Sequence, residues 1–125
     1  MTDKSGQKFK RYWRYYRTES GNCPVQDFLD TLDDDDAEEL LAEMRHVARE
    51  GKKAARHLSG EIYEVRATGE NRIFRVLFAS LGHFSHVLLG FDGFSKKTQR
   101  TPPAKIALAK KRLKDWIKRG EKKPT

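Results

Sequence analysis

The sequence is poor in cysteine and in long hydrophobic runs, and each shortage excludes a class of protein. Cys23 is the only cysteine among 125 residues, so no internal disulfide can form, which fits a reducing, cytoplasmic location. No stretch approaches the ~20 apolar residues that cross a membrane, so no membrane partner is expected. The polar, basic N-terminus predicts no secretory signal. We expect one domain over residues 1–125, frayed at residues 1–8 and 120–125.

Acidic side chains are scarce along most of the chain and concentrated in one segment. Residues 19–50 hold eleven acidic and two basic side chains, whereas residues 92–125 hold twelve basic and three acidic ones. The whole chain has a net charge of +8. A basic surface suits a polyanion such as a nucleic acid, and the acidic segment is expected to face elsewhere. The alternative is that the basic surface serves only solubility.

Apolar residues at helical spacing predict three helices. The first is predicted over residues 23–32 and the second over residues 33–50, where four aspartates suit the positive end of the helix dipole. Gly51 suits the C-terminal cap of the second helix. The third helix is predicted over residues 101–120, with Thr101 as its N-cap.

Aromatic and β-branched residues predict four strands. Residues 8–18 predict the first, for which an edge position is open, and residues 61–91 predict three more. Arg75 shares a strand face with Ile73 and Leu77, so it needs a partner or a function, because burying an unpaired charge is costly. The expected fold class is α+β, with the order β-α-α-β-β-β-α and a small antiparallel sheet with helices packed on one side.

The carboxylates and histidines do not predict a metal site, and no cofactor is expected. The adjacent carboxylates of residues 33–36 cannot all converge on one ion, and the four histidines are scattered. His57 lies in a basic segment that leads into the predicted sheet, from which it could reach a substrate.

Basic residues near the predicted sheet form the most informative set. Arginine can clamp a phosphate through two parallel hydrogen bonds, so cations before, within and after the strands are of interest if they border one surface. The set consists of Lys52, Lys53, Arg56, Arg66, Arg72, Arg75, Lys96, Lys97 and Arg100. A solvated basic rim is the alternative, above all for Lys52 and Lys53.

Two segments carry a recognisable pattern. In residues 58–79 a leucine and a glycine lead to Glu64-Val65-Arg66, and an arginine-rich strand follows. In residues 93–112 the pattern is Phe-x-Lys-Lys-x-x-x-Thr-Pro, followed by a helix. Together the segments resemble the HigB-like, phage-associated branch of the RelE/ParE type II toxin superfamily.

The resemblance implies a toxin of a toxin–antitoxin pair, with the same order of strands and helices. Such toxins cleave mRNA in the A site of the 70S ribosome without a metal. Their partner is a cognate antitoxin, which in this branch is often a helix-turn-helix protein. Two alternatives stay open: a non-catalytic module that binds RNA or the ribosome, and a toxin of the same superfamily that inhibits gyrase.

The implied chemistry assigns roles to the basic set. When a ribose 2′-hydroxyl attacks the adjacent phosphate, positioned cations stabilise the developing charge. The predicted catalytic residues are Arg66, Arg75, Lys96 and Lys97. The predicted RNA-binding residues are Lys52, Lys53, Arg56, Arg72 and Arg100. Candidates for general acid and base are His57, Tyr63 and Glu64.

Two of these assignments have a qualification. Glu64 is alternatively a salt-bridge partner of Arg66, which we favour. Asp92 stands where relatives often carry a histidine, and an aspartate does not replace a neutral imidazole as a proton carrier. The identity of the general acid is therefore open.

Overall fold

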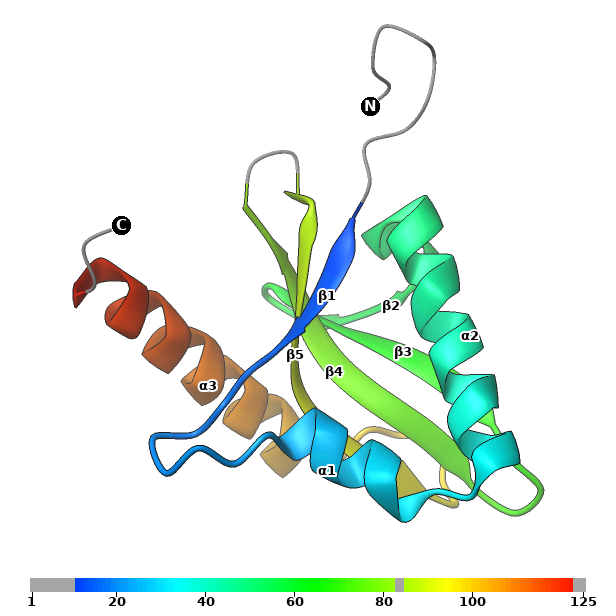
Figure 1. Cartoon of the computed structure of the whole chain (residues 1–125). Coiled ribbons are helices and arrows are strands. Elements are labelled where there is room, and N and C mark those ends of the chain that lie inside the picture. The colour runs from blue at the N-terminus through cyan, green and yellow to red at the C-terminus, as the bar shows by residue number, and fades with distance from the viewer. Residues whose placement is uncertain (1–10, 83–84, 123–125) are drawn as a thin grey trace, which may run out of the picture.

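The computed structural model describes residues 11–82 and 85–122, and it shows a five-stranded mixed sheet with helices on both faces (Figure 1). The elements in chain order are β1 (Tyr12–Tyr15), α1 (Pro24–Thr31), α2 (Asp34–Glu50), the 3-10 helix η1 (Lys52–Ala54), β2 (Arg56–Ser59), β3 (Ile62–Thr68), β4 (Ile73–Leu81), β5 (Val87–Lys96) and α3 (Pro103–Lys122). The predicted α+β class is confirmed, although β2 is an additional strand. None of the helices in the described residues is long and apolar enough to cross a membrane.

The first two helices form where their sequence signals lie. Pro24 occupies the first turn of α1, where its missing N–H costs no hydrogen bond. The side chain of Asp33 caps α2 by accepting a hydrogen bond from the backbone N–H of Asp36 at 2.8 Å. Gly51 ends α2 with a φ of 87°, a conformation that favours glycine. The aspartate run is therefore a helix start, as predicted.

The sheet differs from the predicted one in two strands. Its strand order is β1-β5-β4-β3-β2, and β1 pairs with β5 in parallel, so the sheet is not wholly antiparallel. The first predicted strand is confirmed at a sheet edge over Tyr12–Tyr15, whereas residues 16–18 lie beyond its end and residues 8–10 lie outside the described residues. At the other edge, β2 forms a short hairpin with β3, and its four residues lack the apolar alternation that marks a strand.

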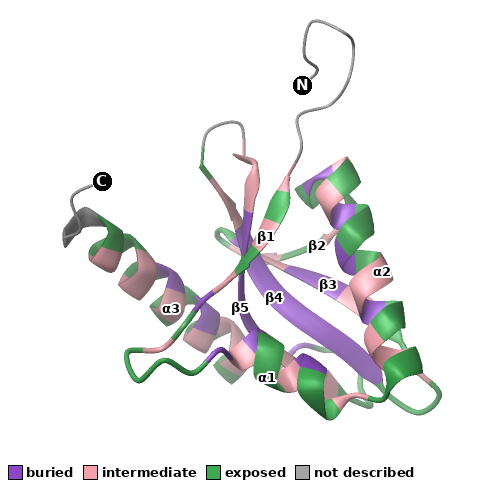
Figure 2. Ribbon diagram, viewed as in Figure 1, coloured by how far each residue is buried: buried purple, intermediate pink, exposed green. Residues whose placement is uncertain are grey.

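Helices cover both faces of the sheet, so the prediction of helices on one side is wrong. Val25 of α1 and Leu40 of α2 belong to the core on one face, together with Val76 of β4. Leu113 of α3 belongs to the core on the other face, together with Leu77 of β4. Neighbouring residues of β4 are thus buried on opposite faces, and Figure 2 shows most of this strand as buried. A strand buried on both faces needs cover on both.

Polar contacts fix α3 to its face of the sheet. Asp92 of β5 is buried and pairs with Lys105 of α3 at 3.0 Å, so Asp92 has a structural role. The Arg112 guanidinium donates to the carbonyl of Phe91 at 2.8 Å, and the Tyr16 hydroxyl donates to Asp115 at 2.6 Å. The Tyr16 hydrogen bond is the main reason why the pKa of Asp115 lies below its usual value.

The two ends of α3 differ from the predicted ones. The helix begins at Pro103, and the carbonyl of Pro102 accepts the first backbone hydrogen bonds. Thr101 is therefore not the predicted N-cap, because its hydroxyl bonds elsewhere. At the other end the helix continues through Gly120 to Lys122, where fraying was predicted, and residues 123–125 lie outside the described residues.

Replacing Gly93 by alanine is expected to lower the free energy of unfolding by about 1–3 kcal/mol, because the added methyl overpacks the core. An added Cβ would lie 2.5 Å from Cδ2 of Phe28, whose ring fills the space between α1 and β5. Gly120→Ala is the matched control: it meets no atom within 4 Å, and helix propensity favours it by up to about 1 kcal/mol. Urea unfolding followed by circular dichroism measures both, and equal effects would contradict the close contact.

Candidate functional site

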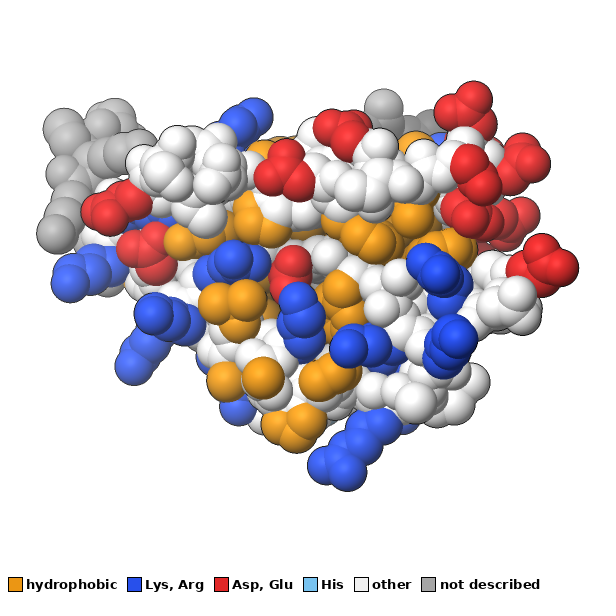
Figure 3. All heavy atoms as spheres, turned by 90° about the horizontal axis from the view of Figure 1, so that it is seen from below, with side chains coloured by type: hydrophobic (Ala, Val, Ile, Leu, Met, Phe, Trp, Pro, Cys, Tyr) orange, Lys and Arg blue, Asp and Glu red, His pale blue; other side chains and the backbone are white. Residues whose placement is uncertain are grey.

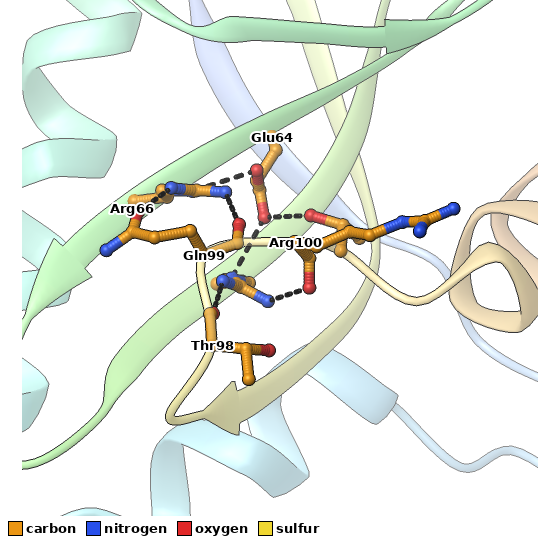
Figure 4. Close-up of polar contacts among 7 residues, drawn as sticks. Glu64, Arg66, Thr98, Gln99 and Arg100 are labelled. Atoms are coloured by element: carbon orange, nitrogen blue, oxygen red, sulfur yellow. Dashed lines mark hydrogen bonds and ion pairs between the residues drawn. The ribbon is translucent and has the colours of Figure 1, made fainter.

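Glu64 is the centre of a buried charged cluster that ties β3, β4 and the loop before α3 together (Figure 4). Its side chain is inaccessible to solvent, and Arg66 contacts it through Nε at 3.0 Å. Nε of Arg75 lies 3.2 Å from the other carboxylate oxygen, and the Thr101 hydroxyl donates to that oxygen at 2.7 Å. The predicted salt bridge between Glu64 and Arg66 is confirmed. With both oxygens occupied, Glu64 holds structure together and is poorly placed to carry a proton.

Arg75 holds the loop of residues 97–102, here called the β5–α3 loop, against the sheet. Its guanidinium donates to the backbone carbonyls of Thr98 and Arg100, the latter at 3.1 Å. Its side chain has no exposed area. Burial lowers the pKa of this guanidinium, and the Glu64 carboxylate opposes the shift. The need for a partner was predicted correctly, whereas a substrate phosphate has no direct access to Arg75 in this structure.

Arg66 makes a second connection to the same loop. Its guanidinium donates to the side-chain oxygen of Gln99 at 2.9 Å and also to the backbone carbonyl of Gln99. About 19% of the Arg66 side chain remains exposed. Of the two predicted strand arginines, Arg66 is therefore the one that solvent and substrate can reach.

The β5–α3 loop and β2 border an open hollow of about 370 Å³, here called the β2 hollow. It is lined by Arg56, His57, Leu58, Gln99, Arg100, Thr101 and Ile106. Arg56 and Arg100 are both exposed, and Figure 4 shows the Arg100 side chain pointing away from Glu64. Arg56 also lines a neighbouring hollow of about 420 Å³, together with Arg66. Three predicted cations thus border two open hollows at one edge of the sheet.

His57 is the acid–base candidate that lines the β2 hollow. Its Nε2 lies 2.7 Å from the carbonyl of Gly60, and because a carbonyl only accepts, Nε2 carries the hydrogen. In the neutral ring Nδ1 is then the nitrogen that can accept a proton. Tyr63 packs against the core on the α2 side of the sheet and lies under the ammonium group of Lys52 at 5.6 Å. Tyr63 is thus directed away from the face that carries Glu64, and the ring of His57 packs against it with the ring centroids 5.0 Å apart.

The structure does not bring all predicted cations to the β2 hollow. Lys96 is the last residue of β5 and pairs with Ile73, so it lies at the far end of β4, and Lys97 follows it. Arg72 lies in the adjoining turn, close enough to Asp36 to affect its pKa. Burial and neighbouring carboxylates raise the pKa of Asp36, and the positive charge of Arg72 opposes this shift. Lys53 is exposed in η1 and, like these residues, is not part of the lining.

The surface charge follows the split in the sequence. On the face shown in Figure 3, Lys and Arg side chains lie mostly on the lower half, and Asp and Glu mostly along the upper and right margins. Among the described residues, no group of three His, Cys, Asp or Glu side chains is placed to hold a metal ion. The lower half of the face shown in Figure 3 is therefore mainly positively charged.

Sequence reasoning missed two residues of this site. Gln99 contacts Arg66 only because the β5–α3 loop folds back over β3, a path that no periodicity reveals. Thr101 had a sequence signal, the Thr-Pro pair, but the signal was assigned to helix capping. Its hydroxyl instead bonds to Glu64, 37 residues earlier in the chain.

The fold and the site define a small α+β protein with a mixed five-stranded sheet and a cationic edge, an architecture compatible with small α+β toxins. The family model described as phage derived protein Gp49-like (DUF891) matches residues 27–114, and the chain belongs to this family. The family is part of the RelE/ParE-like toxin superfamily, so the resemblance is confirmed at this level. A search of curated proteins found no match. The matched range includes every residue that lines the β2 hollow.

Proposed function

We propose that this protein is the toxin of a type II toxin–antitoxin pair, of the HigB-like branch, and that it cleaves mRNA in the A site of the 70S ribosome. Membership of the Gp49-like family supports a toxin that pairs with an antitoxin. The observation that carries the endonuclease proposal is the β2 hollow, whose lining contains the exposed Arg56 and Arg100 together with His57. We propose a cytoplasmic location and a helix-turn-helix antitoxin on the resemblance alone.

In the proposed reaction Nδ1 of His57 takes the proton of a ribose 2′-hydroxyl. The 2′-oxygen then attacks the adjacent phosphorus, and the bond to the 5′-oxygen breaks. The products are a 2′,3′-cyclic phosphate and a 5′-hydroxyl, whose proton comes from water. Arg56 and Arg100 hold the phosphate oxygens and stabilise their growing negative charge, which gives the step a source of positive charge other than a metal.

The other predicted cations are assigned to RNA binding rather than to the cleavage step. Lys52, Lys53, Arg72, Lys96 and Lys97 are exposed and lie outside the β2 hollow. We propose that they contact RNA phosphates of the mRNA or of the ribosome, where each neutralised phosphate releases a counterion. Arg66 and Arg75 then act on the reaction by placing the β5–α3 loop, with Arg66 also facing the neighbouring hollow.

Induced expression in a bacterial host tests the proposed function. We expect growth arrest, and primer extension on cellular mRNA should show new 5′ ends within codons. The purified protein should cut mRNA only when ribosomes are present. Salt-sensitive RNA binding without any cleavage would overturn the endonuclease proposal and favour a binding module. DNA-damage signalling without RNA cleavage would instead indicate a gyrase inhibitor.

A further inference from the structure

We propose that Gln99 reads a base of the bound RNA and favours guanine over adenine. The inference rests on the proposed function, because it places a nucleotide in the β2 hollow. It concerns a residue that lies in the hollow but has no part in the transfer of charge or protons. Three features of the structure lead to it: the orientation of the Gln99 amide, the charge beside it and the hydrogen-bonding character of the lining.

The orientation of the Gln99 amide is set by its partner. Nη1 of Arg66 lies 2.9 Å from Oε1 of Gln99, and a guanidinium can only donate hydrogen bonds. The oxygen end of the amide therefore faces Arg66, and the NH₂ end is the end left for a ligand. A second bond, from Arg66 to the backbone carbonyl of Gln99, fixes the residue at its main chain as well. The amide is thus held by a guanidinium group that is itself paired with Glu64.

The charge of Arg66 decides which ligands the amide can bind. A glutamine with both ends free pairs with adenine, donating to N7 and accepting from the N6 amino group. Here the guanidinium stands next to the accepting oxygen, so an approaching amino group meets a positive charge. The donating end has no such obstacle. The preference that a free glutamine would have for adenine is therefore removed.

Two arginines of the lining also donate. Arg56 and Arg100 have no accepting atoms in their side chains, and both line the hollow with Gln99. Guanine offers two adjacent acceptors, O6 and N7, on one edge, whereas adenine offers N7 beside a donor. Uracil separates its two carbonyls by an N–H group. The donating end of Gln99 beside these two arginines thus matches guanine best, with a discrimination of about tenfold, typical of one good base contact.

Mapping of cleavage sites across cellular mRNA tests the inference in the full chain. The wild-type protein should show guanine enriched at one fixed position relative to the cut. Gln99→Leu and Gln99→Glu, which remove the donors, should reduce that enrichment by about tenfold. Gln26→Leu is the matched control, because Gln26 is an exposed residue of α1 whose side-chain amide donates to Asp30 in the same helix. A preference that Gln99→Leu leaves unchanged would overturn the inference.

A binding measurement separates this inference from the proposed function. The probes are two short single-stranded RNAs with 2′-O-methyl riboses, which cannot be cleaved, and they differ only in a central guanine or adenine. Tighter binding of the guanine RNA, lost in Gln99→Leu but kept in Gln26→Leu, supports base reading even if no mRNA cleavage is ever seen. Equal binding of both RNAs by the wild-type protein contradicts base reading, whatever the outcome of the cleavage assay.

Discussion

Replacing Arg75 by alanine is expected to lower the free energy of unfolding by about 3–5 kcal/mol, the cost of removing one partner from a buried ion pair. The variant leaves the inaccessible carboxylate of Glu64 without its β4 partner and frees the carbonyls of Thr98 and Arg100. The β5–α3 loop then loses its attachment to the sheet. Urea unfolding followed by circular dichroism gives the free energy. Lost toxicity in this variant would report lost structure rather than a missing catalytic charge.

Two comparisons make the Arg75 prediction specific. Arg66→Ala is the control within the cluster; its side chain is partly exposed and water can replace it, so we expect a loss nearer 1 kcal/mol. The double variant Glu64→Leu with Arg75→Met removes both charges together and should unfold less readily than Arg75→Ala, because no unpaired charge is buried. An Arg75→Ala protein within about 1 kcal/mol of the wild type would contradict the role of Arg75 as the loop's attachment.

Local signals predicted the helices well, whereas the pairing of strands was beyond them. Asp33 and Gly51 mark the ends of α2 because capping depends on residues a few positions apart. The pairing of Tyr12 with Val87 joins segments 75 positions apart, and no local pattern encodes such a contact. The two-sided burial of β4 was readable in principle, since residues 76–79 are all apolar.

The candidate site shows the same difference between local features, which the sequence predicts, and long-range contacts, which it does not. That Arg75 lies among apolar neighbours followed from strand alternation, and the structure shows its partners. That Arg56 and Arg100 meet at one hollow could not be predicted, because it depends on the backbone path of the β5–α3 loop. This path is set by arginine side chains donating to loop carbonyls, and backbone carbonyls carry no sequence signal. Chemistry-bearing residues were therefore easier to find than their grouping.

Replacing Arg56 and Arg100 together by alanine is expected to abolish toxicity and to reduce ribosome-dependent mRNA cleavage by at least about 100-fold. Removing one positioned donor to a developing oxyanion commonly costs a factor of this size. Stability should change by less than about 0.5 kcal/mol, because both side chains are exposed. Alanine at residue 100 also keeps the backbone carbonyl that binds Arg75. Growth after induction and primer extension measure the effect, and circular dichroism confirms the fold.

The matched control for this double variant is Lys114→Ala with Lys118→Ala on α3. It removes the same two charges from an exposed surface that does not line the β2 hollow. A general electrostatic attraction to the ribosome depends on the net charge of the protein, so it would weaken equally in both double variants. Its salt dependence reports the number of phosphate contacts. A local role in phosphate stabilisation predicts lost cleavage only in the Arg56 and Arg100 variant. Full cleavage by that folded variant would remove the β2 hollow from the mechanism and leave Lys96 and Lys97 as the exposed catalytic candidates.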